Sequence, residues 1–212
     1  MLVKDLFKGC LTIPNLLSVI RIILVPVFAM LYLQGNMFAA VVVLAVSGLT
    51  DLFDGKIARR FNQVSAMGKI LDPIADKITQ ITVAIILLIK FRQAESTVIN
   101  AFSWVFIVFL AKEGLMVLGG LVMILLNIRP GAAEMPGKIA TVVFYTVMTL
   151  IIAFGPEVGA LRSFFTMNDI LTGILVIISA IMTLIAFASY MPATYSQFKE
   201  RFSKKQNIEK AE

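Results

Sequence analysis

The last quarter of the sequence contains the run ILTGILVIISAIMTLIAFASYM, which occupies Ile170–Met191 and holds no charged residue. About 20 apolar residues are enough for an α-helix to cross the hydrocarbon core of a bilayer. The rest of the chain has the same character, because 59% of its 212 residues are hydrophobic and 15% are charged, against about 25% charged residues in a soluble domain. This composition excludes a water-soluble enzyme, a disordered tail and a coiled coil, and it predicts an integral membrane protein.

Six apolar segments of this kind follow one another, separated by short polar turns. They are Ile13–Leu33, Met37–Ala58, Lys69–Ile89, Phe102–Leu126, Gly137–Phe154 and Ile170–Met191. A short amphipathic segment precedes them at Met1–Lys8, and such a segment can lie on a membrane surface. We therefore predict an all-α integral membrane fold of six transmembrane helices, with residues 1–12 as a juxtamembrane segment, 13–191 as one membrane domain and 192–212 as a basic tail.

The Lys and Arg residues are divided unevenly between the two sides of the predicted membrane. One side has only Lys90, Arg92 and Arg162. The other side has twelve, namely Lys4, Lys8, Arg59, Arg60, Lys69, Arg129, Lys138, Lys199, Arg201, Lys204, Lys205 and Lys210. Because cytoplasmic loops carry the excess of positive charge, both termini are predicted to be cytoplasmic.

The net charge of +6 fits this orientation and contact with anionic lipid. It does not indicate nucleic acid, since the chain has no soluble basic domain to bind it. The size of the chain and the absence of a targeting presequence favour a bacterial plasma (inner) membrane.

The chain has no histidine and a single cysteine, Cys10. Histidine-based triads, His-ligated zinc or haem, an intrachain disulfide and a multi-cysteine metal site are therefore excluded. Any metal site has to be built from oxygen ligands.

Carboxylates concentrate where the second predicted helix ends and the third begins. Asp51 and Asp54 are three residues apart and Asp72 and Asp76 are four apart, so each pair shares one helix face. The short connection makes the two helices antiparallel neighbours, which brings all four carboxylates together just below the lipid headgroups. Four such groups repel one another unless cations compensate, and hard oxygen ligands favour Mg²⁺, Mn²⁺ or Ca²⁺. The pattern predicts a two-metal site of the kind that serves phosphoryl transfer.

Two further roles for these carboxylates are compatible with the spacing. The aspartates can form ion pairs with neighbouring lysines and arginines, as they would in a purely structural membrane subunit. A cation transporter also uses intramembrane acids, but places them near the midplane on broken helices, whereas these crowd one boundary. Gly55 and Ala58 lie on the Asp51 face, where small side chains admit either a flat ligand or a neighbouring backbone.

The stretch from Asp51 to Asp76 has the pattern D-x₂-D-G-x₂-A-R-x₈-G-x₃-D-x₃-D. It resembles the signature of the CDP-alcohol phosphotransferase family at all eight defining positions, with the family's usual spacing. Ile13–Arg21 is similar to the first helix of phosphatidylglycerophosphate synthases, where Thr is common at the position of Ser18. Gly137–Thr141 is similar to their G-K-x-x-T segment, and cardiolipin synthases of the same superfamily share much of both segments.

The resemblance implies a substrate, a cofactor and a set of site residues. CDP-diacylglycerol would bind through its pyrophosphate to Mg²⁺ or Mn²⁺ in a two-metal site. The implied metal ligands are Asp51, Asp54, Asp72 and Asp76, and Asp76 would also be the catalytic general base. The implied contacts to the nucleotide-lipid are Asn15, Gly55, Ala58, Arg59, Ser65 and Gly68. A homodimer is implied as well.

The expected acceptor is glycerol 3-phosphate, whose phosphate needs cations near the metal site. The candidates are Arg21, Lys112, Arg129 and Lys138. Arg21 and Lys112 lie inside predicted spans, where surface solvation does not explain them, although Lys112 can instead pair with Glu113. Arg129 and Lys138 lie in a predicted cytoplasmic loop, where topology alone also accounts for them. The alternative is cardiolipin synthesis, with phosphatidylglycerol as the acceptor.

Overall fold

The structure is a computed structural model, and it describes the whole chain except residues 1–11, 62, 64, 66, 127–134 and 210–212. The amphipathic segment predicted at Met1–Lys8 lies outside the described residues. Within the described residues the secondary structure is helical, without a strand. The helices are α2 (Ile13–Leu33), α3 (Met37–Arg60), α4 (Gly68–Gln93), α5 (Thr97–Leu125), α6 (Met135–Phe154) and α7 (Asp169–Glu209).

Helix α2 begins and ends at clear local signals. The Thr12 side chain accepts a hydrogen bond from the backbone N–H of Asn15 (3.4 Å), and Pro14 occupies the first turn, where its missing N–H costs nothing. Gly35, with φ of 84°, takes the left-handed conformation that follows the end of the helix. The predicted segment Ile13–Leu33 is therefore confirmed at both ends.

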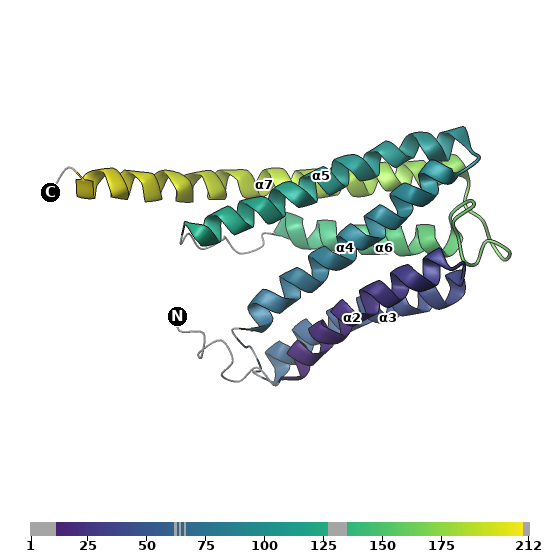
Figure 1. Cartoon of the computed structure of the whole chain (residues 1–212), viewed down its shortest axis with the longest axis horizontal. Helices are drawn as coiled ribbons and strands as arrows, with labels where there is room; N and C mark the ends of the chain where they lie inside the picture. The colour runs from purple at the N-terminus through teal and green to yellow at the C-terminus, as the bar shows by residue number, and fades with distance from the viewer. Residues whose placement is uncertain (1–11, 62, 64, 66, 127–134, 210–212) are drawn as a thin grey trace.

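The helices form a bundle in which α2 and α3 lie side by side and α4 packs between α2 and α5 (Figure 1). Helix α7 packs against α5 and α6. We call the end where α2 begins and residues 61–67 join α3 to α4 the motif end. The opposite end, where residues 155–168 join α6 to α7, is the loop end. The starts of α2, α4 and α6 all lie at the motif end (Figure 1).

Helix α7 is longer than the sequence predicted. The prediction ended the last span at Met191, but the helix continues through Pro192 to Glu209 and projects beyond the other helices at the motif end (Figure 1). Its 41 residues correspond to about 60 Å at the rise of an α-helix. One proline is the only strong helix breaker in this region, and it removes a single backbone hydrogen bond. The change from apolar to basic sequence therefore changes the surroundings of the helix without ending it.

The protein is a multi-pass membrane protein. Among the described residues, four helices are long and apolar enough to cross a bilayer, namely α2, α5, α6 and α7. Helices α3 and α4 form as predicted, but the apolar part of α3 is limited to Met37–Thr50, because the charged motif occupies the rest of α3 and the start of α4. That these two helices also span the membrane stays a prediction.

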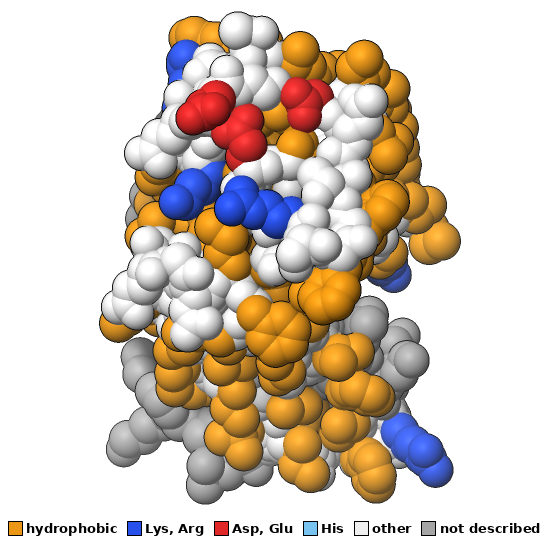
Figure 2. All heavy atoms as spheres, turned by 90° about the vertical axis from the view of Figure 1, so that its right-hand side faces the viewer, with side chains coloured by type: hydrophobic (Ala, Val, Ile, Leu, Met, Phe, Trp, Pro, Cys, Tyr) orange, Lys and Arg blue, Asp and Glu red, His pale blue; other side chains and the backbone are white. Residues whose placement is uncertain are grey.

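The loop end is held together by hydrogen bonds between distant parts of the chain. The Tyr32 hydroxyl donates to the carbonyl oxygen of Val158 (2.8 Å). The Glu157 carboxylate accepts from the backbone N–H groups of Glu95 (2.8 Å) and Ser96 (3.0 Å) at the start of α5. Acidic and basic side chains gather on this face, with hydrophobic side chains around them (Figure 2). These contacts fix the ends of α2, α4 and α5 relative to one another.

The two halves of the bundle bury different kinds of side chain. Toward the loop end the buried side chains are mostly apolar, and Ser103 and Thr172 are buried there as well; the apolar ones include Phe28, Leu87, Phe91, Phe106, Phe144 and Ile151. Toward the motif end and the middle, the buried side chains include Asn15, Ser18, Arg21, Ser65, Lys112 and Glu113. Burial of polar and charged groups inside a membrane bundle is costly and typical of functional sites. The candidate site therefore lies in the half of the molecule that contains the aspartate motif.

Candidate active site

Asp72 and Asp76 lie one turn apart on α4, and both contact side chains of α2. The Ser18 hydroxyl donates a hydrogen bond to Oδ1 of Asp72. The Arg21 guanidinium forms an ion pair with Asp76, with 2.5 Å between Nη1 and Oδ1. Ser18 and Arg21 are both fully buried, whereas the Asp76 side chain is 30% exposed. The structure thus brings Arg21 to the predicted catalytic residue.

The start of α2, the α3–α4 connection and the start of α4 meet through a short chain of hydrogen bonds. The backbone N–H of Gly68 donates to Ser65 Oγ (2.8 Å), and the Ser65 hydroxyl donates to Asn15 Oδ1 (2.9 Å). Asn15 and Ser65 are both buried. A Cβ atom at Gly68 would lie 2.5 Å from Asn15 Oδ1 and 3.1 Å from Ser65 Oγ, so a larger residue there would displace the Asn15 side chain or the start of α4. Three of the six residues predicted to contact the nucleotide-lipid therefore form one cluster.

The other members of the motif lie on the last turns of α3. Asp51, Asp54, Gly55, Ala58 and Arg59 belong to this helix, but their side chains lie outside the described residues. The end of α3 and the start of α4 both lie at the motif end (Figure 1), but among the described residues each helix packs against α2 rather than against the other, so the direct antiparallel packing of α3 on α4 expected from the sequence is wrong. Convergence of all four carboxylates stays a prediction, and the side chains that are described contain no group of three or more candidate metal ligands.

The donor set suits a hard divalent cation. Asp72 and Asp76 present carboxylate oxygens one turn apart on one face of α4, and the chain has no histidine to compete as a ligand. The 30% exposure of the Asp76 side chain leaves it accessible from outside the bundle. Carboxylate oxygens are the ligands that Mg²⁺ and Mn²⁺ prefer.

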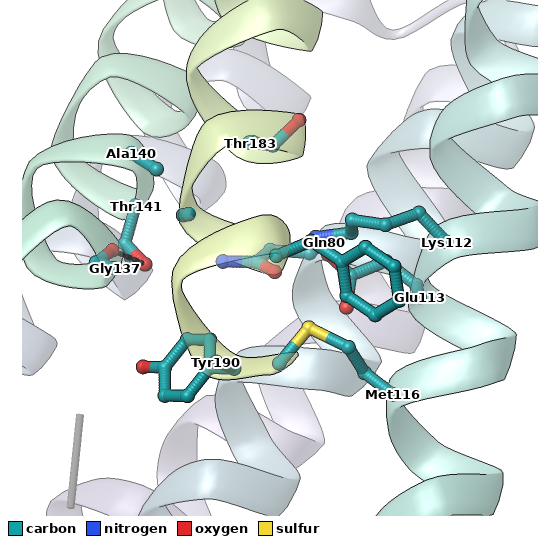
Figure 3. A pocket seen from close by; sticks show the side chains of 11 residues that line it. Gln80, Lys112, Glu113, Met116, Gly137, Ala140, Thr141, Thr183 and Tyr190 are labelled. Atoms are coloured by element: carbon teal, nitrogen blue, oxygen red, sulfur yellow. Dashed lines mark hydrogen bonds and ion pairs between the residues drawn. The ribbon is translucent and has the colours of Figure 1, made fainter. Parts of the chain in front are cut away.

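A pocket lies between α4, α5, α6 and α7, about one helical turn from Asp76. It is lined by Gln80, Lys112, Glu113, Met116, Gly137, Ala140, Thr141, Thr183, Ala186, Phe187 and Tyr190. Figure 3 shows Gln80, Lys112 and Glu113 near one another on one side of α7, with Thr141 and Tyr190 on the left of this helix in the view. Gly137 permits this closeness of α6 and α7, because a Cβ atom there would lie 2.6 Å from the Tyr190 hydroxyl.

Lysine charge exceeds carboxylate charge beside this pocket. Glu113 is fully buried and forms ion pairs with both Lys112 and Lys77. Lys112 is itself only 7% exposed. One carboxylate therefore pairs with two lysines, and these three side chains have a formal charge of +1, with Lys112 buried and Lys77 29% exposed. An anionic group of a ligand would compensate this charge.

Of the four cations predicted for the acceptor phosphate, the structure describes three, and these occupy different places. Lys112 lines the pocket. Lys138 is exposed on the first turns of α6 and does not line it. Arg21 contacts Asp76, and Arg129 lies outside the described residues.

Sequence reasoning missed three polar residues that line this pocket, Gln80, Thr183 and Tyr190, and it did not predict the partner of Lys77. Gln80 could have been found, because it follows Asp76 by four residues and so shares its helix face. Lys77 is one of the neighbouring lysines that the sequence allowed as partners of the aspartates, but it pairs with Glu113. Tyr190 had no signal in the sequence, since it reaches the pocket only through the packing of α7 against α6.

Comparison with known proteins agrees with the family resemblance found in the sequence. Residues 11–186 match the protein family described as CDP-alcohol phosphatidyltransferase. The chain is 32% identical over 181 residues to the CDP-diacylglycerol–glycerol-3-phosphate 3-phosphatidyltransferase of Aquifex aeolicus, which covers 85% of this chain and 94% of that protein. It is 47% identical over 74 residues to a cardiolipin synthase (CMP-forming) of Streptomyces coelicolor, covering 32% of this chain and 34% of that protein. With the human cardiolipin synthase (CMP-forming) the identity is 51% over 75 residues, covering 35% and 25%.

Proposed function

This chain belongs to the CDP-alcohol phosphatidyltransferase family, and we propose that it transfers the phosphatidyl group of CDP-diacylglycerol to glycerol 3-phosphate. The products are phosphatidylglycerol phosphate and CMP. The Aquifex relative, whose alignment covers most of both chains, is named for transfer to glycerol 3-phosphate, which supports this choice of acceptor. The pocket charge described above supports it independently.

The reaction breaks a phosphoanhydride bond and forms a phosphate ester bond. A hydroxyl oxygen of the acceptor attacks the phosphorus that carries diacylglycerol, and the bond from that phosphorus to the CMP oxygen breaks. CMP leaves with the bonding electrons, and Asp76 accepts the proton of the attacking hydroxyl. Arg21 holds this carboxylate from the side of α2, while part of the Asp76 side chain stays exposed to receive the proton.

Asp51, Asp54, Asp72 and Asp76 would hold the divalent cations, Mg²⁺ or Mn²⁺. When bound, these ions neutralise the phosphate oxygens and stabilise the leaving group. The donor set of Asp72 and Asp76 supports this assignment. The four aspartates would then carry both metal binding and, at Asp76, proton transfer.

The cluster of Asn15, Ser65 and Gly68 is proposed to bind the nucleotide-lipid, together with Gly55, Ala58 and Arg59 of α3. Hydrogen bonds fix the cluster at the start of α2 and α4, close in sequence to Asp72. We place the motif end on the cytoplasmic side, since most Lys and Arg residues belong to it. In this orientation the acyl chains stay in the bilayer while the water-soluble acceptor arrives from the cytoplasm.

The observation that carries the choice of acceptor is the excess lysine charge beside the pocket. Lys112 is buried, and Glu113 is shared with Lys77. Gln80, Thr141 and Tyr190 add polar groups around it. A phosphate group would compensate the charge and accept hydrogen bonds from these side chains. The phosphate of glycerol 3-phosphate fits this position, about one turn along α4 from the proposed base.

Cardiolipin synthesis is the second candidate. The cardiolipin synthases of Streptomyces and human match with higher identity, but over about a third of this chain (32% and 35%). Such an enzyme would use phosphatidylglycerol as the acceptor at the same aspartate site. The two candidates differ in the acceptor pocket and not in the chemistry.

Acceptor competition tests the proposal directly. Purified protein in detergent would receive CDP-diacylglycerol, Mg²⁺ and either glycerol 3-phosphate or phosphatidylglycerol, and the lipid product would be identified by mass spectrometry. We expect phosphatidylglycerol phosphate from the first acceptor and no cardiolipin from the second. Cardiolipin formed only with phosphatidylglycerol would contradict the proposed acceptor and support the second candidate.

The variant Lys112→Met tests the pocket. Loss of a charged hydrogen-bond donor to phosphate should raise the KM for glycerol 3-phosphate by about tenfold or more, with the KM for CDP-diacylglycerol little changed. Glu113 keeps Lys77 as its partner in this variant, which protects the fold. Lys90→Met, near the loop end of α4, is the matched control. An unchanged KM for glycerol 3-phosphate in Lys112→Met would remove Lys112 from the acceptor site.

A further inference from the structure

We infer that α2 contributes two positioning residues to the active site, Ser18 for Asp72 and Arg21 for Asp76. The inference rests on the proposed roles of these two aspartates. It gives Arg21 a place different from the acceptor-phosphate site predicted from the sequence. Helix α2 contains no member of the aspartate motif, but through Ser18 and Arg21 it would orient two of the four carboxylates of that motif.

The two contacts form one repeating arrangement. Helices α2 and α4 both begin at the motif end and run in the same direction (Figure 1). Ser18 and Arg21 are three residues apart, Asp72 and Asp76 are four apart, and each member of one pair contacts one member of the other. Successive turns of α2 therefore hold successive turns of α4. Together the two contacts fix the direction of both carboxylates relative to the bundle.

The hydroxyl of Ser18 can orient Asp72 because its proton has a preferred acceptor. Ser18 Oγ also lies 3.0 Å from the carbonyl oxygen of Pro14, but it has only one proton to donate. A charged carboxylate is a stronger acceptor than a carbonyl oxygen, so the proton is directed to Asp72. The fully buried position of Ser18 keeps water from replacing it.

The burial of the Arg21–Asp76 pair is asymmetric. The Arg21 side chain is 1% exposed, whereas that of Asp76 is 30% exposed. Solvent on the carboxylate weakens the attraction, whereas enclosing the carboxylate as well would add the cost of removing its hydration. Here the guanidinium is enclosed and the carboxylate remains accessible. This arrangement suits a carboxylate that has to meet a substrate or a cation while its position stays fixed.

Arg21 does not belong to the acceptor pocket. It is not among the residues that line the pocket, whereas Lys112 is. The positive charge of Arg21 lies against Asp76 and weakens the attraction of this carboxylate for a divalent cation. Arg21 should therefore affect two properties of Asp76: its orientation, which governs turnover, and its attraction for cations, which governs metal affinity.

Two substitutions of Arg21 separate these effects. Mn²⁺ binding to the purified full-length protein would be followed by the electron paramagnetic resonance signal of free Mn²⁺, and CMP release would give kcat and KM. In Arg21→Met the Mn²⁺ dissociation constant should fall at least threefold, because the positive charge that repels a cation at Asp76 is removed. Arg21→Lys keeps the positive charge, so its Mn²⁺ dissociation constant should stay within twofold of wild type.

Both Arg21 variants should lower kcat at least tenfold, because neither reproduces the planar guanidinium contact. The KM for glycerol 3-phosphate should change less than threefold. Ser18→Ala should lower kcat several-fold, and Ser18→Thr, which keeps the hydroxyl, should restore it. Arg92→Met is the matched control, because Arg92 stacks on Trp104 near the loop end at 4.2 Å from the ring centre.

Two results would overturn the inference. The first is an equal Mn²⁺ affinity in wild type and Arg21→Met, or no Mn²⁺ binding by either. The second is a rise of more than tenfold in the KM for glycerol 3-phosphate with kcat retained, which would place Arg21 at the acceptor. If wild type releases no CMP with any acceptor but Arg21→Met still binds Mn²⁺ more tightly than Arg21→Lys, the positioning of Asp76 stands and the proposed reaction fails.

Discussion

Gly68 shows how closely the groups around the proposed nucleotide site are packed. Its backbone N–H donates to Ser65, and the space where a side chain would begin is occupied by Asn15 and Ser65. The residue stands at the first position of α4, four residues before Asp72. A displacement here would move α2 and α4 apart at the level of the aspartates.

The variant Gly68→Ala should therefore lose activity even though alanine favours helix formation. Its Cβ atom would lie 2.5 Å from Asn15 Oδ1, so Asn15 or the start of α4 has to shift. We expect the KM for CDP-diacylglycerol to rise by about tenfold, equivalent to the loss of roughly one good hydrogen bond. Gly48→Ala is the control, because nothing lies within 4 Å of a Cβ atom at Gly48. Equal kinetics of the two variants would contradict a binding role for this cluster.

The sequence predicted some site residues and could not predict the role of others. The aspartate pairs follow from helical spacing, because residues three or four apart share a face. Arg21 was placed at the acceptor because an arginine inside a span needs a function, but the sequence does not tell which partner it meets. That partner depends on the packing of α2 against α4, helices separated by more than 30 residues of chain. The same limit explains why the pairing of Lys77 with Glu113 was missed.

Among the helices, the contact between α5 and α7 depends on a small residue. Gly173 of α7 faces the ring of Phe102 on α5, and a Cβ atom at this position would overlap the ring. Gly119 and Gly120 of α5 have nothing within 4 Å of such an atom. Close approach of helix backbones at small residues is a common basis for packing inside membranes.

Gly173→Ala should destabilise the bundle by about 1–3 kcal/mol, the usual cost of overpacking. The measurement is the thermal unfolding midpoint of the purified protein in detergent, followed by circular dichroism. Gly120→Ala should leave that midpoint near the wild-type value. A Gly173→Ala midpoint equal to that of the Gly120→Ala control would show that α7 and α5 do not pack in this way.

Helix bounds were predictable where local signals mark them. Thr12, Pro14 and Gly35 delimit α2, and the predicted and observed bounds agree. The end of α7 was mispredicted, because the transition from apolar to basic residues after Met191 was taken as the end of the element. Hydropathy reports the surroundings of a helix, whereas its end requires a cap or a breaker stronger than Pro192 alone.

Across the molecule as a whole, the apolar core and the proposed active site lie in different halves of the bundle. The loop-end half has an apolar core with stacked and edge-on aromatic rings, such as Phe91 against Phe106 at 5.2 Å. The motif-end half and the middle of the bundle also bury charged groups, namely Arg21, Lys112 and Glu113. An apolar core can hold the six helices in register while the other half keeps an accessible polar site. This division is compatible with a reaction whose substrate is half lipid and half nucleotide.

The proposed site is best tested by the Mg²⁺-dependent release of CMP from CDP-diacylglycerol and glycerol 3-phosphate, compared between wild type and Asp76→Asn. Asparagine keeps the shape of the side chain and an oxygen for Arg21 to contact, but it neither accepts the proton nor binds a cation well. Wild type should release CMP only with a divalent cation present, and Asp76→Asn should be slower by about 10²-fold or more. CMP release without a divalent cation, or at an equal rate in a folded Asp76→Asn variant, would contradict the proposed site.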